Sequence, residues 1–123
     1  MTGLDPREAA LLALYEADQR RLDIPPMDGL GQRAKGLVGG VWADLSTLDE
    51  EIGAVSSGWR IERMPPVDRN VLRLGLWELI NRPDVPVPVV IAEAVRLAKT
   101  YSTVRSGAFV NGVLSRLAAD RAG

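Results

Sequence analysis

The sequence predicts an all-α protein, a helical bundle of six or seven helices in two packed three-helix subdomains. Apolar residues recur at helical spacing in several segments, and short polar or proline-rich breaks separate these segments. The one stretch that alternates like a strand, residues 82–88, contains three prolines, which remove the amides that a sheet needs. At 123 residues the chain (1–123) is most simply one domain, long enough to bury a core.

Residues 5–8 predict the start of the first helix. Asp5 can cap the free amides, Pro6 suits the first helical position, and Glu8 stands at the capping-box spacing. The apolar run that follows favours a helix, which we expect to end near Arg20 and Arg21, because cations suit a last turn.

A second helix is expected from about residue 30 to 45. Gly36, Gly39 and Gly40 each cost about 1 kcal/mol relative to alanine inside a helix. Such a cost indicates either the close approach of another helix or local irregularity. A phosphate loop is disfavoured, because the glycines lack both the following Lys-Ser/Thr and a preceding strand.

Three further elements follow from capping and periodicity. Ser46 to Asp49 resembles a capped start of a helix that carries Leu48 and Ile52 on one face. Residues 59–64 favour a short helical turn. Eight of the fourteen residues from Val67 to Ile80 are Val, Leu, Ile or Trp, so we expect a central helix that is covered on more than one side.

The C-terminal third predicts an extended corner and two helices. Residues 82–88 form the corner, and the next helix carries Val90 and Leu97 on one face and ends near Ser102. The last helix, which we expect to start around the Phe109–Gly112 segment, has one apolar stripe, and residues 120–123 should fray.

Composition excludes several classes of function. The chain has no Cys and no His, so a structural zinc site, a cysteine nucleophile and a histidine base are ruled out. Carboxylate or lysine chemistry remains open, but carboxylate pairs on helical surfaces such as Glu50 and Glu51 are usually solvated or capping, so we expect no enzyme activity, no cofactor and no metal. No apolar run approaches the ~20 residues that span a bilayer, and the start MTGLDPREAA is unlike a secretory signal, so we expect a cytoplasmic protein without membrane contact.

The net charge is −1, whereas proteins that bind nucleic acid alone are usually basic. Arginine supplies most of the 15 basic residues, since Lys35 and Lys99 are the two lysines. Arginine forks suit phosphate and carboxylate groups. The chain could hold RNA only through a local basic patch or beside a basic partner.

Several short blocks carry a resemblance over nearly the whole chain: ALY (13–15), LVGGV (37–41), LDEEI (48–52), VDRNVLRL (67–74), WEL (77–79), DVP (84–86), IAEAV (91–95), LAKTY (97–101) and FVNGVL (109–114). In this order they resemble the NusB family of bacterial transcription antitermination factors. The resemblance implies a non-enzymatic protein that pairs with NusE, which is also a ribosomal protein, and binds boxA RNA of ribosomal RNA leaders. Other Nus factors and RNA polymerase would be indirect partners.

The resemblance also implies roles for particular residues. The positions on the RNA side are Arg7, Tyr15, Lys99, Arg105, Phe109 and Asn111. Exposed aromatic rings there can stack on unpaired bases, although Tyr15 and Phe109 could instead pack in the core. The arginine-rich start of the family is reduced here to Arg7, and Ala108 replaces the usual lysine, which should weaken phosphate contacts.

The partner side implied by the resemblance lies along the central helix, at Asp68, Arg69, Leu72 and Arg73. Asp68 could equally cap that helix or pair with a neighbouring arginine. The rival hypothesis is a NusB-like docking scaffold or homodimer that binds little RNA of its own. Convergence of Arg7, Arg20, Arg21 and Arg105 on one surface, with exposed aromatic rings, would favour RNA binding.

Overall fold

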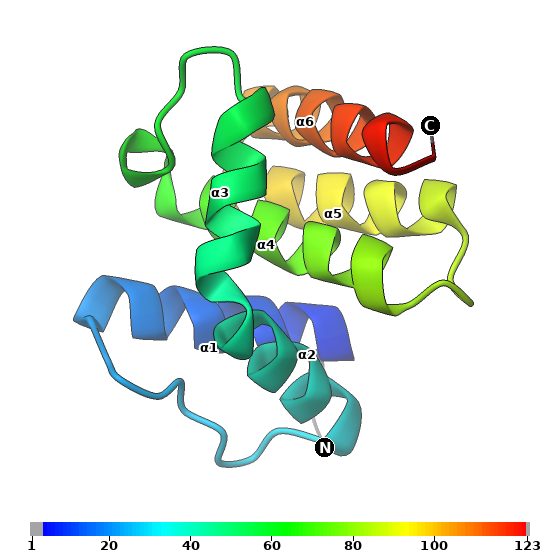
Figure 1. The fold of residues 1–123 in the computed structure, drawn as a ribbon. Coiled ribbons are helices and arrows are strands. Elements are labelled where there is room, and N and C mark those ends of the chain that lie inside the picture. The colour runs from blue at the N-terminus through cyan, green and yellow to red at the C-terminus, as the bar shows by residue number, and fades with distance from the viewer. Residues whose placement is uncertain (1–3, 123) are drawn as a thin grey trace.

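The computed structural model describes residues 4–122, which form six α-helices and one short 3-10 helix and contain no strand (Figure 1). The elements are α1 (Pro6–Arg20), α2 (Gln32–Ala43), α3 (Leu45–Val55), η1 (Ile61–Arg63), α4 (Pro66–Asn81), α5 (Val87–Tyr101) and α6 (Val104–Ala122). The predicted all-α class and number of helices are confirmed.

Helix α4 lies at the centre of the bundle. It packs against α1, α2 and α3 on one side and against α5 and α6 on the other, as Figure 1 shows. Helix α3 crosses between the two groups and also contacts α6. Nine of the residues of α4 are buried, which agrees with the broad apolar arc that its sequence predicted.

The start of α1 is the predicted capping box. The Asp5 carboxylate accepts a hydrogen bond from the backbone N–H of Glu8 at 2.8 Å, and the Glu8 side chain accepts one from the backbone N–H of Asp5. The helix ends at Arg20, and Arg21 follows in the left-handed conformation with φ 52°. Both predicted ends are therefore confirmed.

Close helix approach explains two of the glycines. A Cβ on Gly40 would overlap the indole ring of Trp77 on α4. A Cβ on Gly75 of α4 would come within 2.7 Å of Leu114 on α6. Gly40 therefore confirms the predicted close approach of another helix. Gly40 lets the backbone of α2 lie close to α4, and Gly75 lets the backbone of α4 lie close to α6.

The cap predicted for the third helix, at Ser46, was wrong by two residues. Asp44 ends α2 and is also the residue before α3, so α3 begins at Leu45 and no side chain caps it. Because the chain changes direction at this single residue, Ser46 already lies inside the first turn. A local cap pattern does not reveal such a shared residue.

Two boundaries in the C-terminal third also differ from the prediction. Helix α5 starts at Val87, because Pro88 sits in a first turn where no amide is needed. Helix α6 starts at Val104, so Phe109 lies in its second turn. The helix continues to Ala122, with Arg121 paired to Glu51 at 2.9 Å, so residues 120–122, where fraying was predicted, are helical here; Gly123 lies outside the described residues.

Candidate nucleic-acid interface

A groove opens where the first turns of α6 meet the start of α4 and the segment that precedes η1. We call it the aromatic groove; it has a volume of about 310 Å³ and is lined by Trp59, Pro65, Asp68, Thr103, Arg105, Ser106 and Phe109. Two of these residues, Arg105 and Phe109, were predicted on the RNA side, and Asp68 was predicted on the partner side.

Two aromatic rings form one wall of the aromatic groove. Trp59 and Phe109 meet edge to face, with centroids 6.2 Å apart and an interplanar angle of 60°. Trp59 is 52% exposed, whereas Phe109 is half-buried against the core. A left-handed turn at Ser57 (φ 47°) and Gly58 (φ 87°) directs the chain into Trp59. The pair therefore offers a fixed, solvent-facing surface of the kind on which a base can stack.

Asp68 places a carboxylate beside these rings. It occupies the first turn of α4, where the helix N-terminus favours negative charge. The residue is 3% exposed, and its Oδ1 is buried and accepts no hydrogen bond from any residue between 4 and 122. A buried acceptor without a partner is costly, so a donor supplied by a ligand would be favourable here.

The groove is lined by a single basic residue, Arg105. The exposed guanidinium of Arg105 forms no ion pair with residues 4–122, and the same is true of Arg63 in η1. The Lys99 stem crosses the start of α6, because a Cβ on Gly107 would lie 2.8 Å from its Cγ. Arg105 is thus the basic residue in the lining of the groove, whereas Lys99 lies beside Gly107, on another side of α6.

Asn111 lies away from the aromatic groove. It follows Phe109 by two positions, which places it on the opposite side of α6. Its side chain is exposed and accepts a hydrogen bond from Ser115 at 3.3 Å. The predicted RNA role of Asn111 thus has no geometric link to the aromatic rings.

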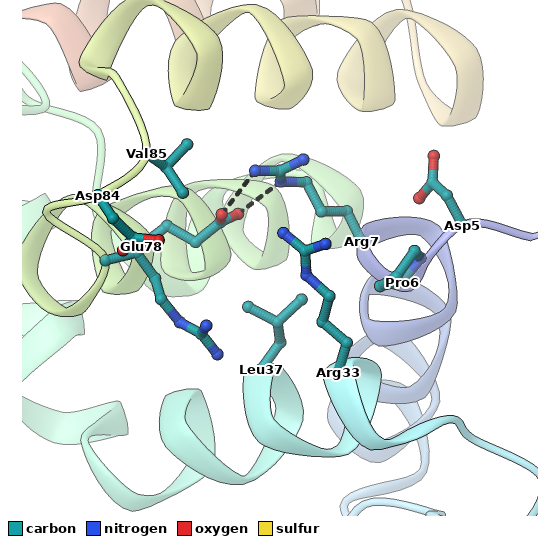
Figure 2. Close-up of a pocket in the computed structure, with 9 residues that line it drawn as sticks. Asp5, Pro6, Arg7, Arg33, Leu37, Glu78, Asp84 and Val85 are labelled. Atoms are coloured by element: carbon teal, nitrogen blue, oxygen red, sulfur yellow. Dashed lines mark hydrogen bonds and ion pairs between the residues drawn. The ribbon is translucent and has the colours of Figure 1, made fainter.

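Arg7 lies at another part of the molecule, and Figure 2 shows its setting. Its guanidinium donates two hydrogen bonds of 2.8 Å to the carboxylate of Glu78 on α4. These hydrogen bonds, opposed by burial, raise the pKa of Arg7. A fork pair between α1 and α4 is a structural contact, and it occupies donors that a phosphate would need.

The remaining N-terminal residues do not gather with Arg105 either. Arg20 pairs with Glu16 one turn earlier on α1, and Arg21 borders a different hollow. Tyr15, which is 37% exposed, projects from the middle of α1 and does not line the aromatic groove. The convergence of Arg7, Arg20, Arg21 and Arg105 that would favour RNA binding is therefore absent from the described residues.

The other residues predicted on the partner side belong to an ion-pair network. Arg69 binds Asp18 at 2.6 and 2.8 Å, and Arg73 binds Asp49 at 2.7 and 2.9 Å. This network joins α1, α3 and α4 and lines an open polar hollow of about 490 Å³. Leu72 is fully buried in the core, so it is not on a surface that a partner can reach.

The carboxyl group of Asp18 is the centre of this network. Burial alone would raise its pKa, but hydrogen bonds from Arg69 and Asn70 and the charges of Arg69 and Arg73 outweigh burial. The pKa of Asp18 consequently lies below its ordinary value.

Comparison with known proteins decides the family. The NusB family model matches residues 4–119. The chain belongs to the NusB family. A transcription antitermination protein NusB from Sorangium cellulosum is 50% identical, covering 91% of this chain and 88% of the relative. Another from Anaeromyxobacter sp. (strain Fw109-5) is 46% identical, covering 92% of this chain and 87% of the relative.

Solved structures agree with the NusB assignment. T. maritima NusB has a TM-score of 0.82 at 35% identity, covering 94% of this chain and 89% of that one. A crystal structure of antitermination factors NusB and NusE in complex with dsRNA has a TM-score of 0.78 at 31% identity, covering 94% of each chain. No helix within residues 4–122 of this NusB-family chain has the length and hydropathy of a membrane span.

The sequence did not single out two residues that the structure places at the candidate sites, one in the aromatic groove and one in the ion-pair network. Trp59 was noted as part of a short turn, and the glycine directly before it was the available signal for a turn that exposes the ring. Asp18 was missed entirely. It lies on α1, 51 positions before Arg69, and nothing in the local pattern of α1 marks it as the acid that this arginine binds.

Proposed function

We propose that this NusB-family chain is a transcription antitermination subunit that binds boxA RNA of ribosomal RNA leader transcripts together with NusE. The observation that carries the proposal is the aromatic groove, in which a stacking surface, an unpaired carboxylate oxygen and a free guanidinium lie side by side. Relatives named as antitermination proteins and a related structure that holds NusE and RNA support it.

The groove suits a single-stranded base better than a duplex. An unstacked base can lie against the Trp59–Phe109 rings, a contact worth roughly 1–3 kcal/mol. The exocyclic amino group of a cytosine is a donor that a carboxylate accepts, and the Asp68 carboxylate lines the groove. Arg105, at the edge of the same groove, can then pair with a backbone phosphate.

A basic partner is needed because this chain holds few free cations near the groove. Arg7 is committed to Glu78, and Arg20 to Glu16. Phosphate neutralisation supplies much of the affinity for RNA, so a basic ribosomal protein beside the groove would add what the chain lacks. The polar hollow that contains Arg69 and Arg73 is next to η1 and is the surface we propose for that partner.

The test is binding of a boxA leader RNA, with and without NusE, at two salt concentrations. We expect tight binding only with NusE, and a loss of about fivefold or more for Trp59→Ala. The matched control is Ile24→Ala, since Ile24 is also an exposed apolar side chain, at 73%, but lies in the loop after α1. Formation of the protein complex without any RNA binding would support the docking-scaffold alternative instead.

A further inference from the structure

The Trp59–Phe109 pair borders two hollows. Besides the aromatic groove, it lines a second hollow of about 420 Å³ on its other side. The second hollow lies between the end of α3 and the middle of α6, and its lining residues are Val55, Ser56, Ser57, Trp59, Ala108, Phe109, Gly112, Val113 and Arg116. The two rings therefore form a ridge between the aromatic groove and the second hollow, which adjoin each other at this pair.

One face of α6 connects the two hollows. Arg105, Phe109, Gly112 and Arg116 are spaced i, i+4, i+7 and i+11, which places them in one row along the helix. The row has a guanidinium at each end and extends about 16 Å along the helix axis, at 1.5 Å per residue. An extended nucleic-acid strand that follows this row would meet a cation, a ring, an open gap and a second cation.

Gly112 lines the second hollow and is exposed. A Cβ at this position would meet no atom within 4 Å, so the absence of a side chain leaves free space that no neighbouring residue fills. Val113 and Val55 provide apolar walls beside it. A flat, mostly apolar ring is the kind of group that this space accepts.

Charge disfavours a basic protein segment as the occupant, and continuity with the aromatic groove along α6 favours RNA over an acid-bearing segment. Arg116 is the charged residue in the lining, and no carboxylate lines the hollow. Its contact with Asp120, at 3.5 Å, is solvent-exposed, and such surface pairs contribute little and exchange readily. A phosphate can therefore compete for the Arg116 guanidinium.

We propose that the bound RNA strand crosses the Trp59–Phe109 ridge and places a further base in the second hollow, with Arg116 at its backbone. This inference rests on the proposed function, because it extends the same strand beyond the aromatic groove. It assigns Gly112 and Arg116 to RNA binding and lengthens the footprint of the chain on single-stranded RNA.

The experiment uses a nested series of boxA RNAs, shortened one nucleotide at a time from each end, with the complex of this chain and NusE. Gly112→Gln fills the second hollow without adding charge. Gly53→Gln is the matched control, since Gly53 is also an exposed helical glycine with no atom near its Cβ position, but it does not line the hollow. Arg116→Gln removes the second cation.

We expect one length step at which the unaltered protein gains about tenfold in affinity and the Gly112→Gln protein gains nothing. Arg116→Gln should reduce the same step and lower the salt dependence by about one phosphate contact. On RNAs too short to cross the ridge, all variants should bind equally.

Other outcomes overturn the inference. Equal length steps in Gly112→Gln and the unaltered protein would show that the second hollow holds no base. A loss of NusE affinity in Gly112→Gln, measured without RNA, would make the hollow a protein contact. If the unaltered protein bound none of the RNAs, the proposed function itself would be wrong. If it bound them without a length step, only the second base site would be wrong.

Discussion

Gly40 of α2 lies directly against the indole ring of Trp77 on α4, with no room for a methyl group between them. The guanidinium of Arg82 covers the same indole at 5.5 Å from its centroid. The ring thus contacts both the backbone of α2 and a cation.

Replacing Gly40 with alanine should destabilise the fold. Alanine gains about 1 kcal/mol in helix propensity, but overpacking against the indole ring costs about 1–3 kcal/mol, so we expect a net loss or no gain. Urea unfolding would measure it. Gly36→Ala is the control, because a Cβ there makes an ordinary contact of 3.7 Å with Arg82, and that variant should be unchanged or more stable. Equal gains in both variants would contradict the close packing at Trp77.

Removing the charge of Asp18 should destabilise the junction of α1, α3 and α4. Asp18→Asn leaves the guanidinium of Arg69 without its fork partner, and we expect a loss on the order of 2–3 kcal/mol for this largely buried pair. Glu16→Gln is the control, since its pair with Arg20 is exposed and should contribute little. Similar small effects in both variants would mean that the Asp18 network adds nothing to stability.

The same carboxylate predicts an acid-sensitive contribution. The pKa of Asp18 is lower in the folded chain than its ordinary value of 3.8. Its stabilisation is therefore complete above that value and is lost as the pH falls through the lower folded pKa. Urea unfolding from neutral pH to about pH 3 should show the difference between the unaltered protein and Asp18→Asn shrinking below about pH 4. A difference that stayed constant would assign the stabilisation to shape rather than to charge.

Arg7 and Arg105 should behave oppositely when each is truncated. Arg7→Ala leaves Glu78 buried without its partner and should cost about 2–3 kcal/mol of unfolding free energy. Arg105→Ala touches no ion pair among residues 4–122 and should leave stability unchanged, within about 0.5 kcal/mol. In NusE-dependent RNA binding the order should reverse, with Arg105→Ala reducing the salt slope by about one. A stable Arg7→Ala protein with weakened RNA binding would restore the RNA role that its sequence position suggested.

Local signals were sufficient for much of the fold. The Asp5–Glu8 box set the start of α1, and the broad apolar arc of residues 67–80 predicted a helix covered on several sides. Both depend on residues close together in the chain, where geometry leaves few alternatives. The predicted helix boundary was wrong at Asp44, because this one residue both ends α2 and precedes α3. It was also wrong at Val104, where the segment expected to be a break is already helical.

The candidate site was predicted less completely, because its parts meet through tertiary packing. Phe109 and Arg105 were predicted as site residues. Trp59, which contacts Phe109, lies before η1 in the chain, 50 positions before Phe109. Arg7 was assigned to the RNA side from the family resemblance, and its partner Glu78, 71 positions away, could not be identified from the sequence of the first helix. The spacing of charges along one helix does not show which are already paired.

The central position of α4 has a consequence for cooperativity. This helix contacts α1, α2 and α3 as well as α5 and α6, so its buried residues complete the cores of both helix groups at once. Neither helix group has a complete hydrophobic core without α4. Cutting the chain in the exposed segment around Gly58 should therefore give two pieces that are poorly ordered alone and fold upon mixing, because each lacks a surface that only the other supplies.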